Sequence, residues 1–207
     1  VSTFAGNPYF IDLETLIDKK LLTKEECENC DWGGSESYVD YEKMYLSRYK
    51  LLRKAYERAD LKNDPDYAVF LKKEKDWLLD YCLFMAIKNA QNGKCWIDWP
   101  EELKDRHSKA VKEAEKELAE EVGFYSFQQY CFTTQWNKLK EYANEKGIQI
   151  IGDVPIYVAL DSSDAWANPE MLQFDEDYNP KAVAGCPPDA FSATGQLWGN
   201  PLYRWEV

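Results

Sequence analysis

Apolar positions recur at helical spacing through the middle of the chain. Between residues 41 and 56, aromatic and aliphatic side chains alternate with Lys, Arg and Glu, which is typical of an amphipathic helix. This first stripe consists of Tyr41, Met44, Tyr45, Leu52 and Tyr56. Asp64-Pro65 predicts the start of a second helix that extends to Gly93, because proline suits a first helical position. Its stripe consists of Val69, Phe70, Trp77, Tyr81, Phe84 and Ile87.

The helical pattern changes character after residue 93. Residues 96–100 (WIDWP) predict a compact aromatic connector that ends at Pro100. Residues 101–121 are rich in Glu, Lys and Ala with opposite charges three or four positions apart, which predicts a solvated helix. Residues 122–142 contain more aromatic side chains, and this favours a helix that packs against a sheet.

The pattern of the last third of the chain is different. After Gly147, a helix stop, the run Ile148, Ile150 and Ile151 predicts a short buried strand. Asp153 then lies where this strand ends and a long Gly/Pro-rich, aromatic loop region begins. Loops of that length are uncommon unless they bind something. Aromatic faces together with carboxylates and amides suit a flat ligand that carries many hydroxyl groups.

Charge and cysteine content exclude several classes of function. The chain has 37 acidic and 25 basic residues in 207, a net charge of -12, which disfavours nucleic acid and anionic membrane surfaces as partners. The longest apolar stretch, residues 81–87, is too short to span a bilayer, and no signal peptide is recognisable. Cys27 and Cys30 form a C-x-x-C pair, but without a second close Cys/His pair we interpret it as coincidence. A reducing cytoplasm is expected.

The elements follow one another in the order helix, glycine, apolar strand and functional loop. This order is typical of an α/β protein. A closed eight-stranded α/β barrel takes about 250 residues. More than half of this chain is expected to be helical, so it cannot complete such a barrel.

Four segments carry a resemblance to a known family. They read FAGNPYFIDLETL near the start, VDYEKMY from Val39, GIQIIGDVPIYVALDSSDAW, and PPDAFSATGQLWGNPLYRW. On these the chain resembles the amylomaltases, disproportionating 4-α-glucanotransferases of glycoside hydrolase family 77. The resemblance implies part of a (β/α)8 TIM barrel with a large helical insertion, the barrel being incomplete in this chain. It implies a cytosolic enzyme that acts on α-1,4-glucans or maltooligosaccharides and uses neither a cofactor nor a metal.

The resemblance also implies a division into three parts. Residues 1–35 would be a barrel loop segment that leads into the insertion, and residues 36–121 would be the helical insertion. Residues 122–207 would supply a barrel helix, a strand and the substrate-binding loops.

The chemistry of the resembled family is retaining, with one carboxylate as nucleophile and a second carboxyl as acid. The family's Arg-x-Asp-His-type nucleophile segment and its later acid do not occur here. The single histidine, His107, lies in a charged stretch that favours a solvated surface position. We therefore expect an internal fragment of such an enzyme, with no catalytic residue of its own.

Binding residues can still be assigned by the resemblance. Asp153 matches an aspartate at the end of the third barrel strand, at the subsite where cleavage occurs. It would accept hydrogen bonds from glucose hydroxyls or orient a catalytic group, and the alternative is a loop-capping aspartate. The residues that match the family's lid loop over the acceptor side are Asp189, Phe191, Gln196 and Trp198. Trp198 would stack on the sugar and exclude water, whereas Phe191 could equally be a packed loop residue.

Two further positions leave alternatives open. Ala190 stands where family members often carry an aromatic residue, which puts the affinity of the lid in doubt. Tyr45 matches a tyrosine of a second glucan-binding site, but its place on a helical stripe favours core packing instead. For the whole chain, a noncatalytic glucan-binding module and a helical interaction domain remain alternatives to the enzyme fragment.

Overall fold

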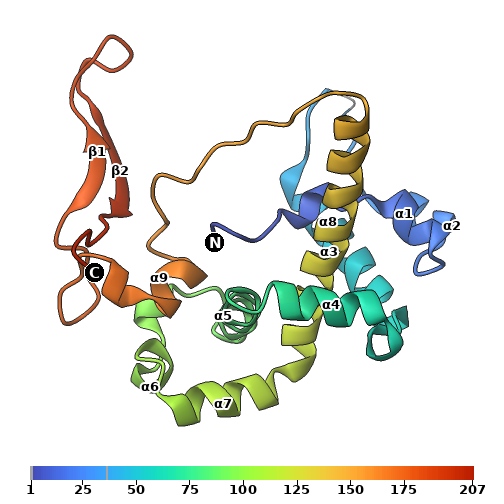
Figure 1. Ribbon diagram of the computed structural model, residues 1–207, viewed down its shortest axis with the longest axis horizontal. Coiled ribbons are helices and arrows are strands. Elements are labelled where there is room, and N and C mark those ends of the chain that lie inside the picture. The colour runs from blue at the N-terminus through green and yellow to red at the C-terminus, as the bar shows by residue number, and fades with distance from the viewer. Residues whose placement is uncertain (1, 36) are drawn as a thin grey trace. The chain divides into compact units, whose positions relative to one another are not determined.

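The computed structural model describes residues 2–35 and 37–207, which form two compact units (Figure 1). Unit 1 contains Asp76–Gly123, Ile151–Val207 and the described residues before Gly6, and unit 2 contains Gly6–Lys75 and Phe124–Ile150. The predicted boundary after residue 121 lies close to the change of unit after Gly123, whereas the one after residue 35 lies inside unit 2. The assignment of these parts to barrel and insertion stays a prediction.

Unit 2 is helical, and its helices begin at side-chain caps. Its elements are η1 (Pro8–Phe10), α1 (Leu13–Asp18), α2 (Lys24–Glu28), α3 (Tyr41–Arg58), η2 (Leu61–Asn63), α4 (Pro65–Lys73) and the part of α8 (Ala119–Glu145) from Phe124 onward. Asp12, Asp40 and Asp64 cap α1, α3 and α4 by accepting hydrogen bonds from first-turn N–H groups. The helix predicted over residues 41–56 and the helix start predicted at Asp64-Pro65 are confirmed.

The core of unit 2 joins α8 to α3 and α1. Phe124, Phe127 and Cys131 of α8 are buried in one cluster with Leu51, Leu52 and Ala55 of α3 and with Leu16 of α1. The prediction that this helix packs against a sheet was therefore wrong for these residues, which contact other helices. Aromatic side chains fit a helix–helix core as well as a helix–sheet core, so the pattern could not distinguish the two.

Two glutamines of α8 hold the N-terminal segment of unit 2 by its backbone. Gln129 accepts a hydrogen bond from Gly6 N (2.8 Å) and donates one to Gly6 O (3.0 Å). Gln135 does the same with Asp12, at 2.7 and 3.1 Å. Each amide thus satisfies a donor and an acceptor in a stretch without regular structure, which fixes the chain's direction into α1.

A helix break lies between Lys73 and Leu78, and the sequence pattern did not predict it. The single helix expected from Asp64 to Gly93 is divided into α4 and α5 (Leu78–Ala90). Residues 72–76 (KKEKD) are all charged, so the apolar stripe is absent for more than a turn. α4 ends where Glu74 N bonds Phe70 O, and α5 starts after Trp77.

The predicted helix over residues 101–121 is also broken. It forms α6 (Glu101–Lys104) and α7 (Ser108–Glu117), and the first turn of α8 follows. Between α6 and α7, Arg106 has a φ of 54°, which ends the first helix. Its guanidinium bonds Asp80 at 2.6 Å and lies 4.2 Å from the Trp166 ring centroid. These tertiary contacts override the local helix propensity. His107 is exposed, as predicted.

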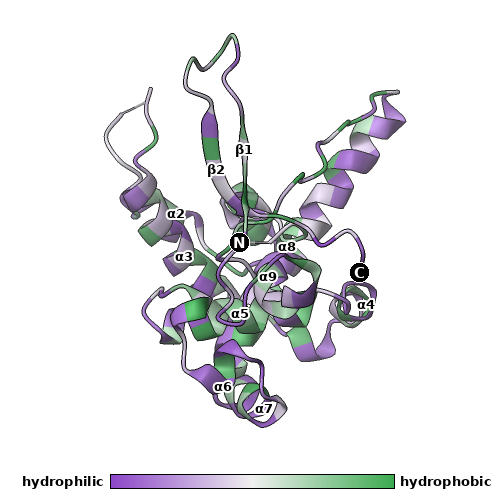
Figure 2. Ribbon diagram, turned by 90° about the vertical axis from the view of Figure 1, so that its left-hand side faces the viewer, coloured by the Kyte–Doolittle hydropathy of each residue, from purple (hydrophilic) through white to green (hydrophobic). Residues whose placement is uncertain are grey.

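Indole rings form the centre of the unit 1 core. Phe84 of α5, a helix whose hydrophobic character is visible in Figure 2, lies 5.3 Å from Trp99 and 6.0 Å from Trp166. The predicted aromatic connector is confirmed as η3 (Trp96–Asp98), with Trp96 and Trp99 both buried. α9 (Ser163–Ala167) and η4 (Pro169–Met171) complete the helical part of the unit, and Trp166 of α9 is fully buried.

The sheet of unit 1 is not where the sequence predicted a strand. Residues 148–155 are irregular, and the Ile151 side chain is 91% exposed, so the predicted buried strand is wrong for this chain. A strand needs a neighbour for its backbone groups, and the described part of the chain provides none here. Instead, β1 (Val183–Cys186) and β2 (Gln196–Pro201) pair antiparallel as the hairpin of Figure 1, with Cys186 opposite Gln196.

The contact at Gly6 yields a stability prediction. A Cβ atom at Gly6 would overlap the ring of Phe132 on α8, and the two backbone bonds to Gln129 prevent the segment from moving away. We expect Gly6→Ala to lower the free energy of unfolding by about 1–3 kcal/mol, the usual cost of overpacking. Chemical denaturation of the two proteins measures the difference.

Gly34→Ala is the matched control, because a Cβ at Gly34 meets nothing within 4 Å. The free energy of unfolding should change by less than about 0.5 kcal/mol in this variant. Equal effects of the two substitutions would contradict the packing that is described for Gly6.

Candidate functional site

The predicted lid residues lie on the β1–β2 hairpin. Its connecting loop, called the hairpin tip (residues 187–195), is organised by Asp189. Asp189 Oδ1 accepts hydrogen bonds from Ser192 N (2.8 Å) and Phe191 N (2.9 Å), and Asp189 N donates to Ser192 O (3.0 Å). These N–H groups, that of Ser192 foremost, lower the pKa of Asp189 below its ordinary value of 3.8. The carboxylate that the resemblance assigns to ligand hydroxyls thus also caps this turn.

Two glycines allow the strands of the hairpin to approach each other. Gly195 has a φ of 74°, and a Cβ there would lie 2.6 Å from Cys186 O. A Cβ at Gly185 would lie 2.5 Å from Gln196 O. Any larger residue at either position would separate the strands beneath the tip.

Trp198 presents its ring beside the tip in a fixed orientation. Its Nε1 donates to Gln196 Oε1 at 2.9 Å, and its ring meets Tyr157 edge-on with centroids 6.1 Å apart. The side chain remains 48% exposed. The side-chain oxygen of Gln196 therefore holds the indole of Trp198, and the NH2 group of Gln196 stays available to a ligand.

The loop that follows Asp153 is held by its carbonyl groups. Consecutive carbonyl oxygens of Val158, Ala159 and Leu160 accept from the side chains of Asn200 (2.9 Å), Ser162 (2.6 Å) and Trp96 (2.7 Å). Next in the chain, Asp161 pairs with Lys88 of α5 at 2.5 Å. This run, called the anchored loop (residues 158–161), fixes the chain just after Asp153 and joins it to β2 through Asn200.

The resemblance assigned Asp153 to glucose hydroxyls or to a neighbouring catalytic group, with a loop cap as the alternative. In the structure its side chain is exposed, and it makes no hydrogen bond or ion pair with the described residues. Phe191 is 96% exposed, so the packed-loop interpretation of that residue was wrong. Both side chains are available to a ligand, and Ala190 between Asp189 and Phe191 adds no ring surface.

Tyr45 belongs to unit 2. It lies on α3 with its ring 4.5 Å from that of Tyr49, and its side chain is 44% exposed. The expectation of core packing was therefore wrong, because the stripe of α3 that is buried runs through Leu51, Leu52 and Ala55. Its role in a second binding site stays a prediction.

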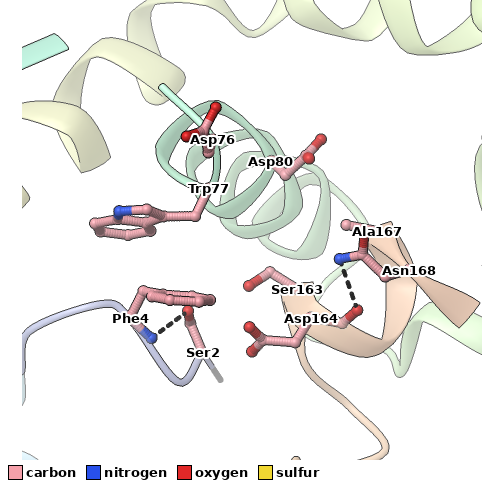
Figure 3. A pocket seen from close by; sticks show the side chains of 9 residues that line it. All are labelled: Ser2, Phe4, Asp76, Trp77, Asp80, Ser163, Asp164, Ala167 and Asn168. Atoms are coloured by element: carbon pink, nitrogen blue, oxygen red, sulfur yellow. Dashed lines mark hydrogen bonds between the residues drawn. The ribbon is translucent and has the colours of Figure 1, made fainter. Parts of the chain in front are cut away.

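A small polar cavity lies elsewhere in unit 1, between the start of the chain, α5 and α9 (Figure 3). The ring of Phe4 stacks on that of Trp77 with centroids 5.9 Å apart, and the Asp164 carboxylate binds the N–H and hydroxyl of Thr3. The cavity measures about 50 Å³. This volume has room for about one or two water molecules at roughly 30 Å³ each, and it is too small for a larger organic ligand.

Metal-ligand geometry is not found among the described residues, since no three His, Cys, Asp or Glu side chains converge. Cys27 and Cys30 are free thiols at the edge of the unit 2 core, and Cys30 donates to Glu26 O. Burial raises the pKa of Cys27, which disfavours the thiolate that metal binding or redox chemistry needs. In the described part of the chain no helix is long and apolar enough to cross a membrane.

Sequence reasoning missed the residues that support the site. Asn200 and Tyr157 link the anchored loop to the hairpin, and Tyr203 stacks on Tyr157 with centroids 6.4 Å apart. Their signal was present in the motifs VPIYVAL and GNPLYRW, where aromatic and amide residues stand among Gly and Pro. The contacts between these two motifs could not be inferred from either motif alone.

Comparison with known proteins identifies a family and several relatives. The model of the family described as 4-alpha-glucanotransferase (glycoside hydrolase family 77) matches residues 1–207. The 4-alpha-glucanotransferase of Clostridium butyricum is 48% identical over 205 residues, covering 99% of this chain and 42% of that protein. The 4-alpha-glucanotransferase of Thermus thermophilus is 47% identical, covering 100% of this chain and 41% of that protein.

A solved structure resembles the whole fold. The amylomaltase from Streptococcus agalactiae in complex with acarbose superimposes with a TM-score of 0.92 at 38% identity. The match covers 99% of this chain and 42% of that one. The chain therefore spans about two fifths of the length of the relatives that it matches.

Acidification should loosen the hairpin tip. Because the folded-state pKa of Asp189 is depressed, its contribution to the tip is present above the ordinary value of 3.8 and is lost as pH falls through the lower folded-state value. We expect the amide NMR signals of Phe191 and Ser192 to shift together, with a midpoint below 3.8, in a titration from roughly pH 5 to pH 2.

The variant Asp189→Asn is the control, since it keeps an oxygen acceptor but removes the titrating group. Its two amide signals should not move over the same range. The described turn would be contradicted by unmoved signals in the unsubstituted chain, or by the same midpoint in both proteins.

Proposed function

Because this chain belongs to the 4-alpha-glucanotransferase family, we propose that it supplies the glucan-binding surfaces of such an enzyme. The enzyme transfers α-1,4-glucan segments between maltooligosaccharides by a retaining mechanism. Its nucleophile and its acid reside on segments outside these 207 residues. The observation that carries the proposal is the exposed Trp198 beside the ordered hairpin tip, within a chain that matches the family from end to end.

The binding role rests on how the hairpin presents its groups. The Trp198 ring offers an apolar face to the C–H face of a glucose unit, and the Gln196 amide lies beside it to bind hydroxyl groups. The backbone of the tip is already ordered by Asp189, so a ligand has to order side chains alone. The amylomaltase from Streptococcus agalactiae, whose structure contains acarbose, supports an oligosaccharide as the ligand class.

The same groups favour transfer over hydrolysis. After the first carboxylate displacement, water and a sugar hydroxyl compete for the glycosyl group. Phe191 and Trp198 would cover the acceptor position when a glucan occupies it, and this burial of their rings excludes water. Asp153 would then bind hydroxyl groups at the cleavage subsite, a role that its exposed, unpaired carboxylate leaves open within the described residues.

A completed fold would also explain the exposed apolar segment before the anchored loop. Ile151, Val154 and Ile156 are all strongly exposed on an extended, unpaired stretch of chain. We propose that this stretch becomes a strand of a (β/α)8 barrel when the remaining segments of the enzyme are present. Strand neighbours would satisfy its backbone groups and bury its side chains.

We further propose a cytoplasmic location. All six cysteines are free thiols, and a reducing compartment would preserve them. A noncatalytic glucan-binding module remains the alternative, and the activity test below distinguishes it.

The activity test joins this chain to the remaining segments of the Clostridium butyricum relative. With maltotriose, the joined protein should form glucose and longer maltodextrins, detected by chromatography, whereas the 207-residue chain alone should not. In the joined protein we expect Asp153→Asn to lower kcat/KM by about 10- to 100-fold, because it removes charged hydrogen bonds to the sugar.

Asp177→Asn is the matched control, since Asp177 is another exposed aspartate of unit 1 outside the site. It should leave kcat/KM within about twofold. Transfer by the chain alone would refute the placement of the catalytic groups. Binding of maltotriose without transfer by the joined protein would favour the noncatalytic module.

A further inference from the structure

Four aromatic side chains of unit 1 form a continuous series of ring contacts. Trp198 meets Tyr157 edge-on at 6.1 Å, and Tyr157 stacks on Tyr203 at 6.4 Å with 15° between the ring planes. Tyr203 then contacts Trp205 at 5.3 Å. This series is called the aromatic ladder (Trp198, Tyr157, Tyr203 and Trp205). The ladder begins at Trp198, which the resemblance assigned to the acceptor side, and continues through Tyr157 and Tyr203 to Trp205.

The backbone beneath the ladder is held on both sides. Tyr157 directly precedes the anchored loop, whose Val158 carbonyl accepts from Asn200 of β2. On the other side, Gln173 Nε2 donates to Tyr203 O at 2.9 Å, and Gln173 N donates to Leu202 O at 2.9 Å. The backbone that carries Tyr157 and Tyr203 therefore has a fixed position before any ligand arrives, which reduces the entropy lost on binding.

Burial along the ladder is graded. Tyr203 is partly buried against the unit 1 core, and desolvation together with the nearby Asp164 raises its pKa, so its phenol stays a neutral hydrogen-bond donor. At the two ends, Trp198 is 48% exposed and Trp205 is 85% exposed. Tyr203 is thus partly buried, whereas the two tryptophans are more exposed.

We propose that the aromatic ladder is a binding surface for an extended α-glucan chain, with glucose units beyond the acceptor position lying against Tyr157, Tyr203 and Trp205. This inference rests on the proposed function. Each glucose unit has apolar C–H surface and a rim of hydroxyl groups, which match a ring face and the phenol and indole donors at its edge. The ladder would make the affinity depend on the length of the oligosaccharide.

Calorimetric titration of the 207-residue chain with maltotriose and maltoheptaose tests the ladder. The unsubstituted chain should bind maltoheptaose more tightly than maltotriose. Trp205→Leu and Tyr157→Leu should each raise the Kd for maltoheptaose about 3- to 10-fold, while the Kd for maltotriose changes by less than about twofold. Trp198→Leu should weaken the binding of both sugars.

Conservative variants separate stacking from folding. Trp205→Tyr and Tyr157→Phe keep an aromatic face and should keep the preference for the longer sugar. If the four residues had a purely structural role, none of these substitutions would change the ratio of the two Kd values. Trp136→Leu is the matched control, because Trp136 is a partly exposed tryptophan of unit 2. It should leave both Kd values unchanged.

The ladder is overturned if Trp205→Leu and Tyr157→Leu retain the full preference for maltoheptaose while Trp198→Leu weakens binding. In that result the proposed function stands and its extension along the chain fails. If the unsubstituted chain binds neither sugar, or if Trp198→Leu has no effect, the proposed binding role fails and the ladder fails with it.

Discussion

The arrangement of the candidate site depends on how an irregular loop satisfies its backbone carbonyl groups. Three consecutive carbonyls of the anchored loop receive hydrogen bonds from Asn200, Ser162 and Trp96, which lie on β2, beside α9 and in η3. Trp96 is fully buried, and a buried carbonyl without a donor would cost about 1–3 kcal/mol. The loop therefore has one favourable position, set by the aromatic core of unit 1. Because Asn200 belongs to the strand that carries Gln196 and Trp198, the same bonds fix the hairpin relative to the loop that follows Asp153.

The rings of the aromatic core pack together, and their indole N–H groups also donate hydrogen bonds to backbone carbonyls. Trp166 donates its indole N–H to Leu103 O, Trp99 donates to Lys94 O, and Trp96 donates to Leu160 O. Each indole thus contributes a large buried surface and also binds a backbone carbonyl of another part of the chain. Arg106 covers Trp166 from the α6–α7 junction and pairs with Asp80, so the break between those helices is part of the same arrangement. The irregular half of unit 1 is consequently ordered by side chains rather than by a sheet.

Sequence patterns predicted what local interactions determine. The starts of α3 and α4 follow from Asp40, Asp64 and Pro65, whose capping effects act within one turn. The break at Arg106 depends on Asp80 and Trp166, which are distant in sequence, so local charge pairing predicted a continuous helix instead. The hairpin was missed because β1 and β2 contain Gly185, Gly199 and Pro201, which read as loop signals. The positions of Asp189 and Trp198 followed from the family resemblance, but the carbonyl network around them could not be inferred, because each donor comes from a different segment.

The hairpin combines an ordered backbone with the free ring of Phe191, and this combination would suit the proposed role of binding and releasing a polymer. Asp189 and the two close-packed glycines leave the tip little backbone freedom, yet Phe191 has almost no contact with the rest of the chain. In the proposed role, closing over a sugar would cost the rotamer freedom of a few side chains, about 0.5–1.5 kcal/mol for each, rather than the larger entropy of ordering a loop. A fully packed Phe191 would avoid that cost but would have no surface left to exclude water. A fully mobile tip would have the surface but would lose the geometry that places it beside Trp198. The observed compromise keeps the contact surface available and its position defined.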